Sequence, residues 1–199
     1  MSPAARLFAT ILFACLPAGA DAAIGTIEIA SDERRRGLSW SQSRAAARAA
    51  LSIEPTTALR IDGAVTTLRG SRRHRGADAV VDLGAGWQNR SGPVRVDAGA
   101  VAHLFAGGAG RLDYAEVQAG LGSTIGPADF AVSASYAPRQ SAIGGEALYL
   151  TADARIAVVG TPFSIIGGLG RSSGAVRDPI RSARLRPESR YIHWRLGVE

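Results

Sequence analysis

Residues 94–104 read Val-Arg-Val-Asp-Ala-Gly-Ala-Val-Ala-His-Leu, and this stretch decides the fold. Apolar side chains stand at every second position, and Arg95, Asp97, Gly99 and His103 stand between them. Successive side chains of a β-strand point to opposite faces, so this stretch has one apolar face and one polar face. The sequence therefore predicts a long β-strand here.

The same alternation recurs along most of the chain. It is strong in residues 77–87, 148–158 and 191–198, and weaker segments fill the gaps at residues 25–30, 45–53, 59–68, 114–124, 129–136 and 163–170. The alanines of residues 43–51 favour a helix by propensity, but Arg44 and Arg48 also fall on one side of a strand, and we assign a strand. The pattern predicts an all-β protein of about ten strands.

The length of the segments and the connections between them favour a membrane protein. A transmembrane strand needs about 9–11 residues, whereas strands of soluble proteins average about 5–6. Long and short connections alternate, as they do between the outer loops and periplasmic turns of outer-membrane barrels. We therefore expect an antiparallel up-and-down transmembrane β-barrel, and a soluble β-domain remains the alternative. Candidates for its aromatic girdle are Trp40, Trp87, Phe105, Tyr114, Phe130, Tyr136, Phe163, Tyr191 and Trp194.

The N-terminus resembles a secretory signal. Arg6 precedes an apolar run over residues 7–16, and Ala20-Asp21-Ala22 fits a cleavage site. The run is too short for a membrane-spanning helix, which needs about 20 residues. We predict a signal peptide at residues 1–22, a barrel domain at residues 23–199, and localisation in the outer membrane.

Composition excludes several classes of protein. All 23 basic residues are Arg, the net charge is +6, and Cys15 is the only cysteine. One cysteine excludes a disulfide framework and a Cys-rich zinc site. Nucleic-acid binding would suit the positive charge, but charges on the predicted strands alternate in sign and no basic groove with interleaved aromatics is present. We therefore expect no nucleic-acid partner.

Charged residues fall on the polar faces of the predicted strands, which point inward in a small barrel. We predict that they line the pore and that neighbours of opposite charge, such as Arg60 with Asp62 and Arg95 with Asp97, set its selectivity. The predicted pore-lining residues are Arg60, Asp62, Asp78, Asp82, Arg95, Asp97, Glu116, Asp153, Arg155 and Arg195.

Arginines also cluster in the long connections, at residues 34–36, 69–75 and 171–190. Guanidinium groups bind phosphates in a bidentate manner, so we expect Arg72, Arg73 and Arg75 to contact phosphates of lipopolysaccharide. Solvated loops are the alternative interpretation.

No catalytic, cofactor-binding or metal-binding set is predicted. His74 falls on a loop, and His103 and His193 fall on polar strand faces without a nucleophile at a suitable spacing. Glycine pairs such as Gly120/Gly122 recur at strand spacing, and we interpret them as sites of tight curvature or of close packing beneath an aromatic ring.

Several motifs, in order, resemble the TorF-type porin family of Gram-negative outer membranes. They are Ser31 followed by Arg36-Gly37-Leu38-Ser39, Val81-Asp82-Leu83-Gly84-Ala85-Gly86-Trp87, Tyr114-Ala115-Glu116, Tyr136-Ala137-Pro138, and Tyr191-Ile192-His193-Trp194. Members of that family tend to continue to an aromatic C-terminus, whereas this sequence ends Leu196-Gly197-Val198-Glu199. The resemblance implies either a shorter ten-strand barrel or a chain that lacks a C-terminal strand pair.

These observations predict a narrow channel for small solutes, anionic ones included, and not an enzyme. Its partners would be outer-membrane lipids, lipopolysaccharide and the barrel-assembly machinery, and the sequence leaves the oligomeric state open. The alternatives are a non-conducting structural barrel that binds lipopolysaccharide or a partner, and a lipid-modifying outer-membrane enzyme.

Overall fold

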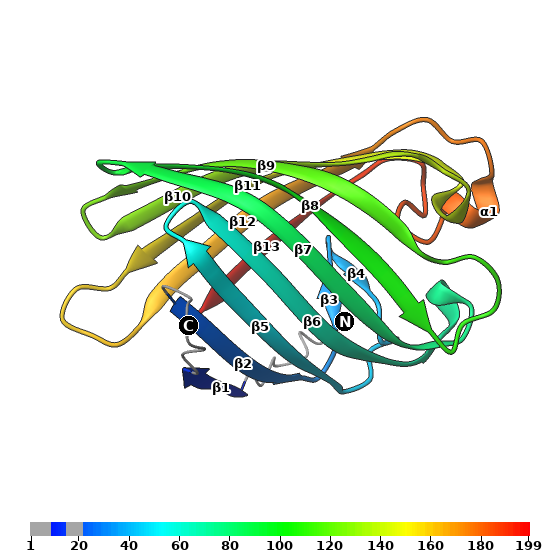
Figure 1. Ribbon diagram of the computed structural model, residues 1–199, viewed down its shortest axis with the longest axis horizontal. Coiled ribbons are helices and arrows are strands. Elements are labelled where there is room, and N and C mark those ends of the chain that lie inside the picture. The colour runs from blue at the N-terminus through cyan, green and yellow to red at the C-terminus, as the bar shows by residue number, and fades with distance from the viewer. Residues whose placement is uncertain (1–8, 15–21) are drawn as a thin grey trace. The chain divides into compact units, whose positions relative to one another are not determined.

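The computed structural model describes residues 9–14 and 22–199, with side chains from Ala23 onward. The described part of the chain is all-β (Figure 1). Its strands are β1 (Ala9–Ala14), β2 (Ala22–Ala30), β3 (Arg34–Arg35), β4 (Leu38–Ser39), β5 (Ala46–Thr56), β6 (Leu59–Ser71), β7 (Ala77–Ser91), β8 (Val94–Ala106), β9 (Tyr114–Ile125), β10 (Ala128–Gln140), β11 (Gly145–Ala157), β12 (Ser164–Ser173) and β13 (Tyr191–Val198). Short helical turns are η1 (Arg72–His74), η2 (Ser141–Ile143) and α1 (Pro179–Ser182).

Ten long strands form one antiparallel sheet in chain order, from β2 and β5 through β13. Strands β3 and β4 pair separately as a small hairpin. The predicted all-β class and the ten predicted strands are confirmed, including the Ala-rich segment that forms β5. The strands run longer than predicted, and β7 reaches Ser91.

The connections explain how the strands reverse direction. Residues 57–58, 92–93 and 126–127 are tight two-residue turns, and Gly92 and Gly126 adopt φ values of 56° and 57° that suit glycine. Residues 31–45, 107–113 and 174–190 are the longest connections. The predicted alternation of long and short connections fails once, because the turn at 158–163 exceeds the neighbouring connection at 141–144.

The edges of the sheet bear on the predicted barrel. The strand order starts with β1, which pairs Ala9–Ala14 with Ile24–Ile29 of β2, and it ends with β13. Among the described residues no ladder joins the two ends of the sheet. The structure thus shows an antiparallel sheet and does not show a closed barrel. Most of the predicted signal peptide, residues 1–8 and 15–21, lies outside the described residues.

The chain divides into two compact units. Unit 1 comprises the chain up to Gly86 together with Val101–Ala115, and unit 2 comprises Trp87–Ala100 and Glu116–Glu199. Strands β7 and β8 contribute to both units.

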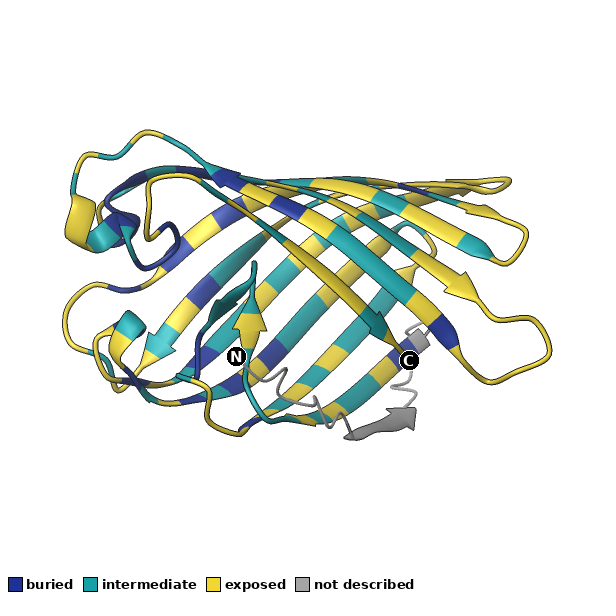
Figure 2. Ribbon diagram, turned by 180° about the vertical axis from the view of Figure 1, so that it is seen from behind, coloured by how far each residue is buried: buried dark blue, intermediate teal, exposed yellow. Residues whose placement is uncertain are grey.

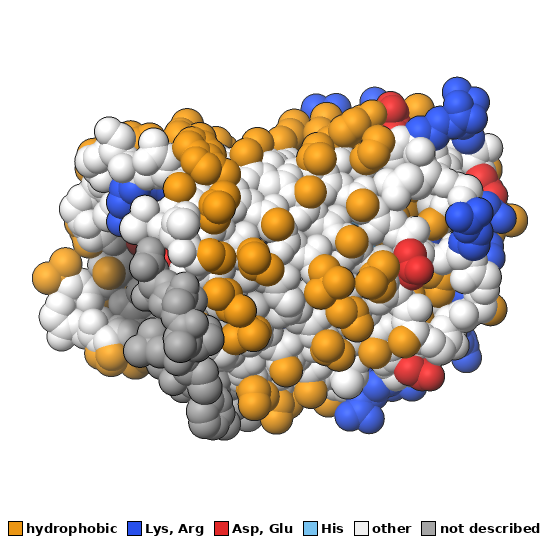
Figure 3. Space-filling model, viewed as in Figure 1, with side chains coloured by type: hydrophobic (Ala, Val, Ile, Leu, Met, Phe, Trp, Pro, Cys, Tyr) orange, Lys and Arg blue, Asp and Glu red, His pale blue; other side chains and the backbone are white. Residues whose placement is uncertain are grey.

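In both units the apolar rows of the strands are exposed. Figure 2 shows exposed positions recurring along the strands, and Figure 3 shows hydrophobic side chains spread over the visible face of the sheet. Exposed examples of unit 1 are Ile29, Leu51, Ile61, Val65 and Leu83, and of unit 2 Val117, Leu121, Val132, Leu150 and Leu169. The opposite face carries the charged side chains, and we call it the polar face.

The aromatic residues do not all join the apolar face. Trp87, Phe130, Phe163 and Trp194 are exposed, as a girdle requires. Trp40 and Tyr114 are buried instead, at 2% and 4% exposure, and belong to the interior of unit 1. The expectation that those two are girdle residues is therefore wrong.

No helix in the described part of the chain has the length and apolar character to cross a membrane.

Candidate functional site

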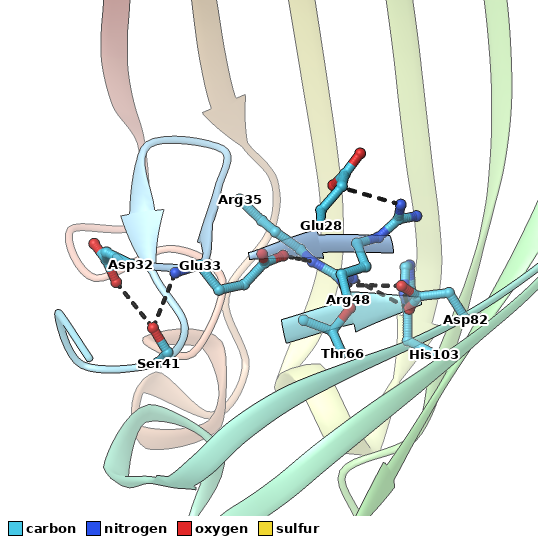
Figure 4. A network of polar contacts seen from close by, with 9 residues as sticks. All are labelled: Glu28, Asp32, Glu33, Arg35, Ser41, Arg48, Thr66, Asp82 and His103. Atoms are coloured by element: carbon cyan, nitrogen blue, oxygen red, sulfur yellow. Dashed lines mark hydrogen bonds and ion pairs between the residues drawn. The ribbon is translucent and has the colours of Figure 1, made fainter. Parts of the chain in front are cut away.

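The connection between β2 and β5, residues 31–45, lies against the polar face of unit 1, and we call it the inner segment (Figure 4). Its β3–β4 hairpin turns at Arg36-Gly37, where φ is 54° and 76°. Two consecutive positive φ values are typical of the type I′ turn, which joins strands without splaying them. The tight turn directs the neighbouring Arg35 towards strands β6 and β7.

Asp32 holds the inner segment together. Its Oδ1 accepts hydrogen bonds from Ser39 Oγ at 2.5 Å, Ser41 Oγ at 3.1 Å and the backbone N–H of Ser43 at 3.1 Å. Ser41 Oγ also accepts from the backbone N–H of Glu33 at 2.9 Å. These bonds join the two ends of the segment, so the hairpin is a self-contained element.

Arg35 is the centre of a polar cluster that joins four elements (Figure 4). Its Nη1 and Nη2 donate to the two carboxylate oxygens of Asp82 on β7, at 3.1 and 2.8 Å. Nη2 also donates to Thr66 Oγ1 on β6 at 3.1 Å, and Nε donates to Glu33 at 2.8 Å. His103 Nδ1 on β8 lies 2.7 Å from Asp82 Oδ1. We call these five residues the Arg35 cluster.

The electrostatics of the cluster fix Arg35 in its charged form. Burial opposes the charge, but the carboxylates of Asp82 and Glu33 outweigh it and raise the pKa of Arg35 above its usual value. The side chains of Arg35 and Asp82 are only 18% and 14% exposed, so solvent screens the pair weakly. Removing one partner of such a pair leaves an uncompensated charge, which costs about 3–5 kcal/mol.

An aromatic group packs beside this cluster. The Trp40 ring lies 4.3 Å from His74 and 5.8 Å from Phe105, measured between ring centroids, and Arg35 Cζ lies 4.5 Å from the Trp40 centroid. A guanidinium at that distance from an indole makes a cation–π contact. The His103 and Tyr114 rings pack in a tilted arrangement, with centroids 4.5 Å apart and an interplanar angle of 33°. Ionic and aromatic contacts thus bind the inner segment to the strands of unit 1.

The sheet register continues the polar row away from Arg35. Glu28 on β2 pairs directly with Arg48 on β5, and Arg48 pairs with Thr66 on β6. Arg48 Nη1 lies 4.0 Å from Glu28 Oε2. The polar face of unit 1 therefore presents a lateral row of groups that can form hydrogen bonds.

Unit 2 has ion pairs of its own on the polar face. Arg195 Nη2 lies 2.8 Å from Asp153 Oδ1, and Arg95 Nε lies 3.6 Å from Asp97 Oδ1. Tyr149 Oη and His193 Nε2 lie 2.7 Å apart, and their rings stack with an interplanar angle of 7°. These pairs place both signs of charge along the same face.

Glycines create the space for these side chains. Gly168 on β12 is paired with Asp153 on one side and with Arg195 on the other, so the Arg195–Asp153 ion pair reaches across it. A Cβ at Gly168 would overlap Asp153 Oδ1. A Cβ at Gly120 would lie 2.6 Å from Asp97 Oδ2. Gly120 is therefore closely packed, but its neighbour is the Asp97 carboxylate and not the expected aromatic ring.

Gly168→Ala is expected to destabilise the folded protein by about 1–3 kcal/mol, the usual cost of forcing extra volume into a packed site. The neighbouring Gly167→Ala is the matched control, because the nearest atoms to its Cβ position are at 3.9 Å. It should be neutral or slightly stabilising, since alanine loses less backbone entropy than glycine on folding. Urea unfolding of the purified protein measures the free energy of unfolding of both variants, and equal effects would contradict the close contact between Gly168 and Asp153.

The predicted pore-lining residues have varied surroundings. Arg60 Nε lies 2.8 Å from Asp62 Oδ2, so this neighbouring pair forms an ion pair, and Arg155 Nη1 lies 3.3 Å from Glu199. Asp78 is exposed, whereas Glu116 is buried and accepts a hydrogen bond from Gln118 Nε2 at 3.1 Å. Their role in a pore remains a prediction.

The predicted phosphate-binding arginines also differ from one another. Arg72 and Arg75 are exposed. Arg73 is partly buried, and its Nε donates to the carbonyl of Ser39 in the inner segment at 3.1 Å. Phosphate binding by these three residues remains a prediction, and Arg73 has a structural contact besides.

The centre of the site differs from the sequence-based prediction. That prediction places residues 34–36 in an outer loop facing lipid phosphates, whereas Arg35 binds Asp82 on the polar face. The short Arg36-Gly37 turn, flanked by Arg35 and Leu38, is the signal in the sequence that indicates a hairpin.

The two histidines of the polar faces each have a side-chain partner. His103 contacts the carboxylate of Asp82, and His193 contacts the phenol of Tyr149. Among the residues described, no group of three or more His, Cys, Asp and Glu side chains is arranged to hold a metal ion.

Comparison with known proteins supplies the family. A model of a bacterial protein family of unknown function, Gcw_chp, matches residues 17–199. The chain belongs to this family. No curated protein and no solved structure shows significant similarity to the chain. The family match covers both units and brings no assigned activity.

Proposed function

We propose that the chain is an outer-membrane β-barrel that provides a narrow pathway for small solutes. The observation that carries this proposal is the separation of the two faces of the sheet. Large apolar side chains are exposed on one face of both units, while paired charges occupy the other. Soluble monomers rarely expose contiguous apolar patches larger than a few hundred Å², whereas a barrel wall presents such a face to lipid.

Strand length supports insertion in a bilayer. Strands β7, β8, β10 and β11 have 15, 13, 13 and 13 residues. About 9–11 tilted residues span the hydrocarbon core, so each of these strands is long enough to cross it and to extend beyond it.

Closure of the barrel is part of the proposal. In a bilayer each unpaired backbone group costs several kcal/mol, so an open sheet edge is not tolerated there. The proposed closure pairs β2 with β13, the first and last of the ten long strands; an even number of strands that alternate in direction allows an antiparallel ladder between them. The second edge of β2 pairs with β1, which lies in the segment predicted to be removed with the signal peptide.

Charge pairing on the polar face limits the expected selectivity. Arg60, Arg95 and Arg195 each lie beside a carboxylate. A wall that presents both signs of charge favours neither cations nor anions strongly.

The number of strands limits the width of the pathway. About eight strands already close around a core filled by side chains, so ten strands leave a narrow interior. The resemblance to TorF-type porins agrees with a channel of this kind.

Site-directed spin labels test the orientation of the strands. Labels at Val96 and Leu150, both exposed on the apolar face, should show lipid contact in protein reconstituted into vesicles. Labels at Thr151, next to Leu150, should contact water or protein instead, because adjacent strand positions face opposite sides. Water contact at both Val96 and Leu150 would reject the membrane barrel.

Conductance across planar bilayers tests the channel. Folded protein purified from membranes should give small, reproducible current steps with weak selectivity between cations and anions. Correct lipid contacts without any current would instead support a non-conducting barrel. The inner segment, which occupies the polar face of unit 1, is the observation that favours this second candidate.

A further inference from the structure

We propose that the inner segment is a gate, held in its closed position by the ion pair between Arg35 and Asp82. This inference rests on the proposed channel function and adds its regulation. Three features of the structure support it: the contacts that dock the segment, the internal contacts that fix its backbone, and the ladder of the flanking strands, which does not include it.

Ionic, hydrogen-bond and aromatic contacts dock the inner segment. Arg35 donates to both carboxylate oxygens of Asp82 and to Thr66 Oγ1, and Arg73 Nε donates to the carbonyl of Ser39. Trp40 packs against His74 and Phe105. Where the segment joins β5, Arg44 Nη2 donates to the carbonyl of Arg69, and Arg69 Nε donates to the carbonyl of Ala45. The contacts of Arg35 and Trp40 hold the hairpin itself, so their loss would free it from the polar face while the bonds to Arg69 keep its end attached.

Contacts inside the inner segment fix its backbone. Among the described residues, six other than glycine have positive φ, and three of them, Arg36, Gln42 and Ser43, lie in the inner segment. Arg36 occupies the turn of the hairpin, and the backbone N–H of Ser43 donates to Asp32 Oδ1 at 3.1 Å and to Ser39 Oγ at 2.9 Å. Undocking leaves these contacts in place, so the hairpin would move as a unit.

The segment can move without unfolding the sheet. The Asp32 hydrogen bonds and the β3–β4 ladder lie entirely within residues 31–45. The strands that flank the segment, β2 and β5, pair with each other from Ala30–Ala46 to Ala22–Glu54. A hinge at the junction of this ladder with the segment would therefore leave the sheet intact.

The closed position places the hairpin over charged positions that a solute would pass. Asp82 and His103 lie on the polar face of β7 and β8, and Arg35 covers Asp82 from the inner segment (Figure 4). In the open position Asp82 would face the pathway without Arg35. Opening would then both widen the pathway and add a negative charge to its wall, which favours cations.

The rate of trypsin cleavage tests whether the ion pair between Arg35 and Asp82 holds the inner segment, and it does not require the protein to conduct. Residues 34–36 provide three consecutive cleavage sites on the hairpin. In detergent-solubilised protein, Asp82→Asn should raise the rate of cleavage at these sites at least tenfold, because it removes the charge that holds Arg35. Asp62→Asn is the matched control. It makes the same chemical change in an ion pair with Arg60, outside the Arg35 cluster, and should leave the cleavage rate unchanged.

A second variant covers the case in which Asp82→Asn fails to fold. Thr66→Val removes only one hydrogen bond to Arg35 and should raise the cleavage rate about tenfold to a hundredfold, as expected for one hydrogen bond to a charged group. Folding of each variant is verified by its heat-dependent migration in gels. Cleavage at the wild-type rate in the folded variants would overturn the proposal.

Planar-bilayer recordings then separate the gate from the channel. Faster cleavage of Asp82→Asn with larger current steps or longer open times would support the gate. Faster cleavage with unchanged currents would overturn the gate and retain the channel. If wild type and variants all fail to conduct, the proposed channel function is rejected, and the gate is rejected with it. The cleavage rates still show whether the contacts of Arg35 hold the inner segment in place.

Discussion

Val132→Arg is expected, in the proposed barrel, to lower the free energy of unfolding in a lipid bilayer by about 2–4 kcal/mol, the cost of an arginine near the midplane on the lipid face. Val132 is 51% exposed on the apolar face of β10. Its neighbours in the sheet are Leu121 on β9 and Ala152 on β11, which are both apolar. No carboxylate of these neighbours can pair with the new charge, so the full cost should be observed.

Ser133→Arg is the matched control, because the adjacent residue points to the polar face. Ser133 is paired with Gly120 and Thr151. The substitution removes the hydrogen bond between Ser133 Oγ and Thr151 Oγ1, at 2.8 Å, which contributes about 1 kcal/mol. Gly120 lies beside Asp97, so a negative charge is close to the substituted position.

Urea unfolding in vesicles, followed by gel migration, gives the difference between the two variants. A loss at Val132 at least about 1 kcal/mol larger than at Ser133 is expected from the two magnitudes. Equal losses would mean that the apolar face is not in contact with lipid. The same pair in detergent should show a smaller difference, because detergent admits water more readily around a charged group.

The period-two pattern predicted the sheet because it depends only on neighbouring residues. Each strand has one face that differs chemically from the other, and alternation records that difference within the strand itself. This is why even β5 was identified against its alanine content. The pairing of Arg60 with Asp62 was also predictable, since residues two apart share a strand face.

Contacts between distant residues were not predictable in the same way. Arg35 and Asp82 are 47 positions apart, and Arg195 and Asp153 are 42 apart. From the local sequence, Arg35 is one of three consecutive arginines in a loop. Its carboxylate partner, Asp82, comes close only in the tertiary structure. Closure of the proposed barrel would require pairing of the two most distant long strands, β2 and β13, and no local pattern specifies such a pairing.

Trp40 was misassigned for a related reason. An aromatic residue near a predicted strand end fits the girdle of a membrane barrel, and the pattern does not distinguish the two faces of a loop. In the structure Trp40 is 2% exposed, whereas Trp87 is 44% exposed on the apolar face. The two tryptophans therefore have opposite environments, and substitution should separate them.

Trp40→Ala is expected to destabilise the docked inner segment by about 3–5 kcal/mol, as is usual when a fully buried aromatic is truncated. The substitution removes the contacts of the indole with His74 and Phe105 and its cation–π contact with Arg35. Trp87→Ala, on the exposed face, should cost about 1 kcal/mol, near the average for single substitutions. Protection of residues 34–36 from trypsin and urea unfolding in detergent provide the two readouts.

The location of the effect is as informative as its size. Loss of Trp40 should expose the cleavage sites at residues 34–36 while strands β10 to β12, which lie wholly in unit 2, keep their resistance to urea. Loss of Trp87 should leave those sites protected. If Trp40→Ala instead unfolded the whole sheet in one step, the inner segment would be an integral part of the core of unit 1. The proposed gate requires that only residues 34–36 become exposed, because the sheet must stay folded when the inner segment undocks.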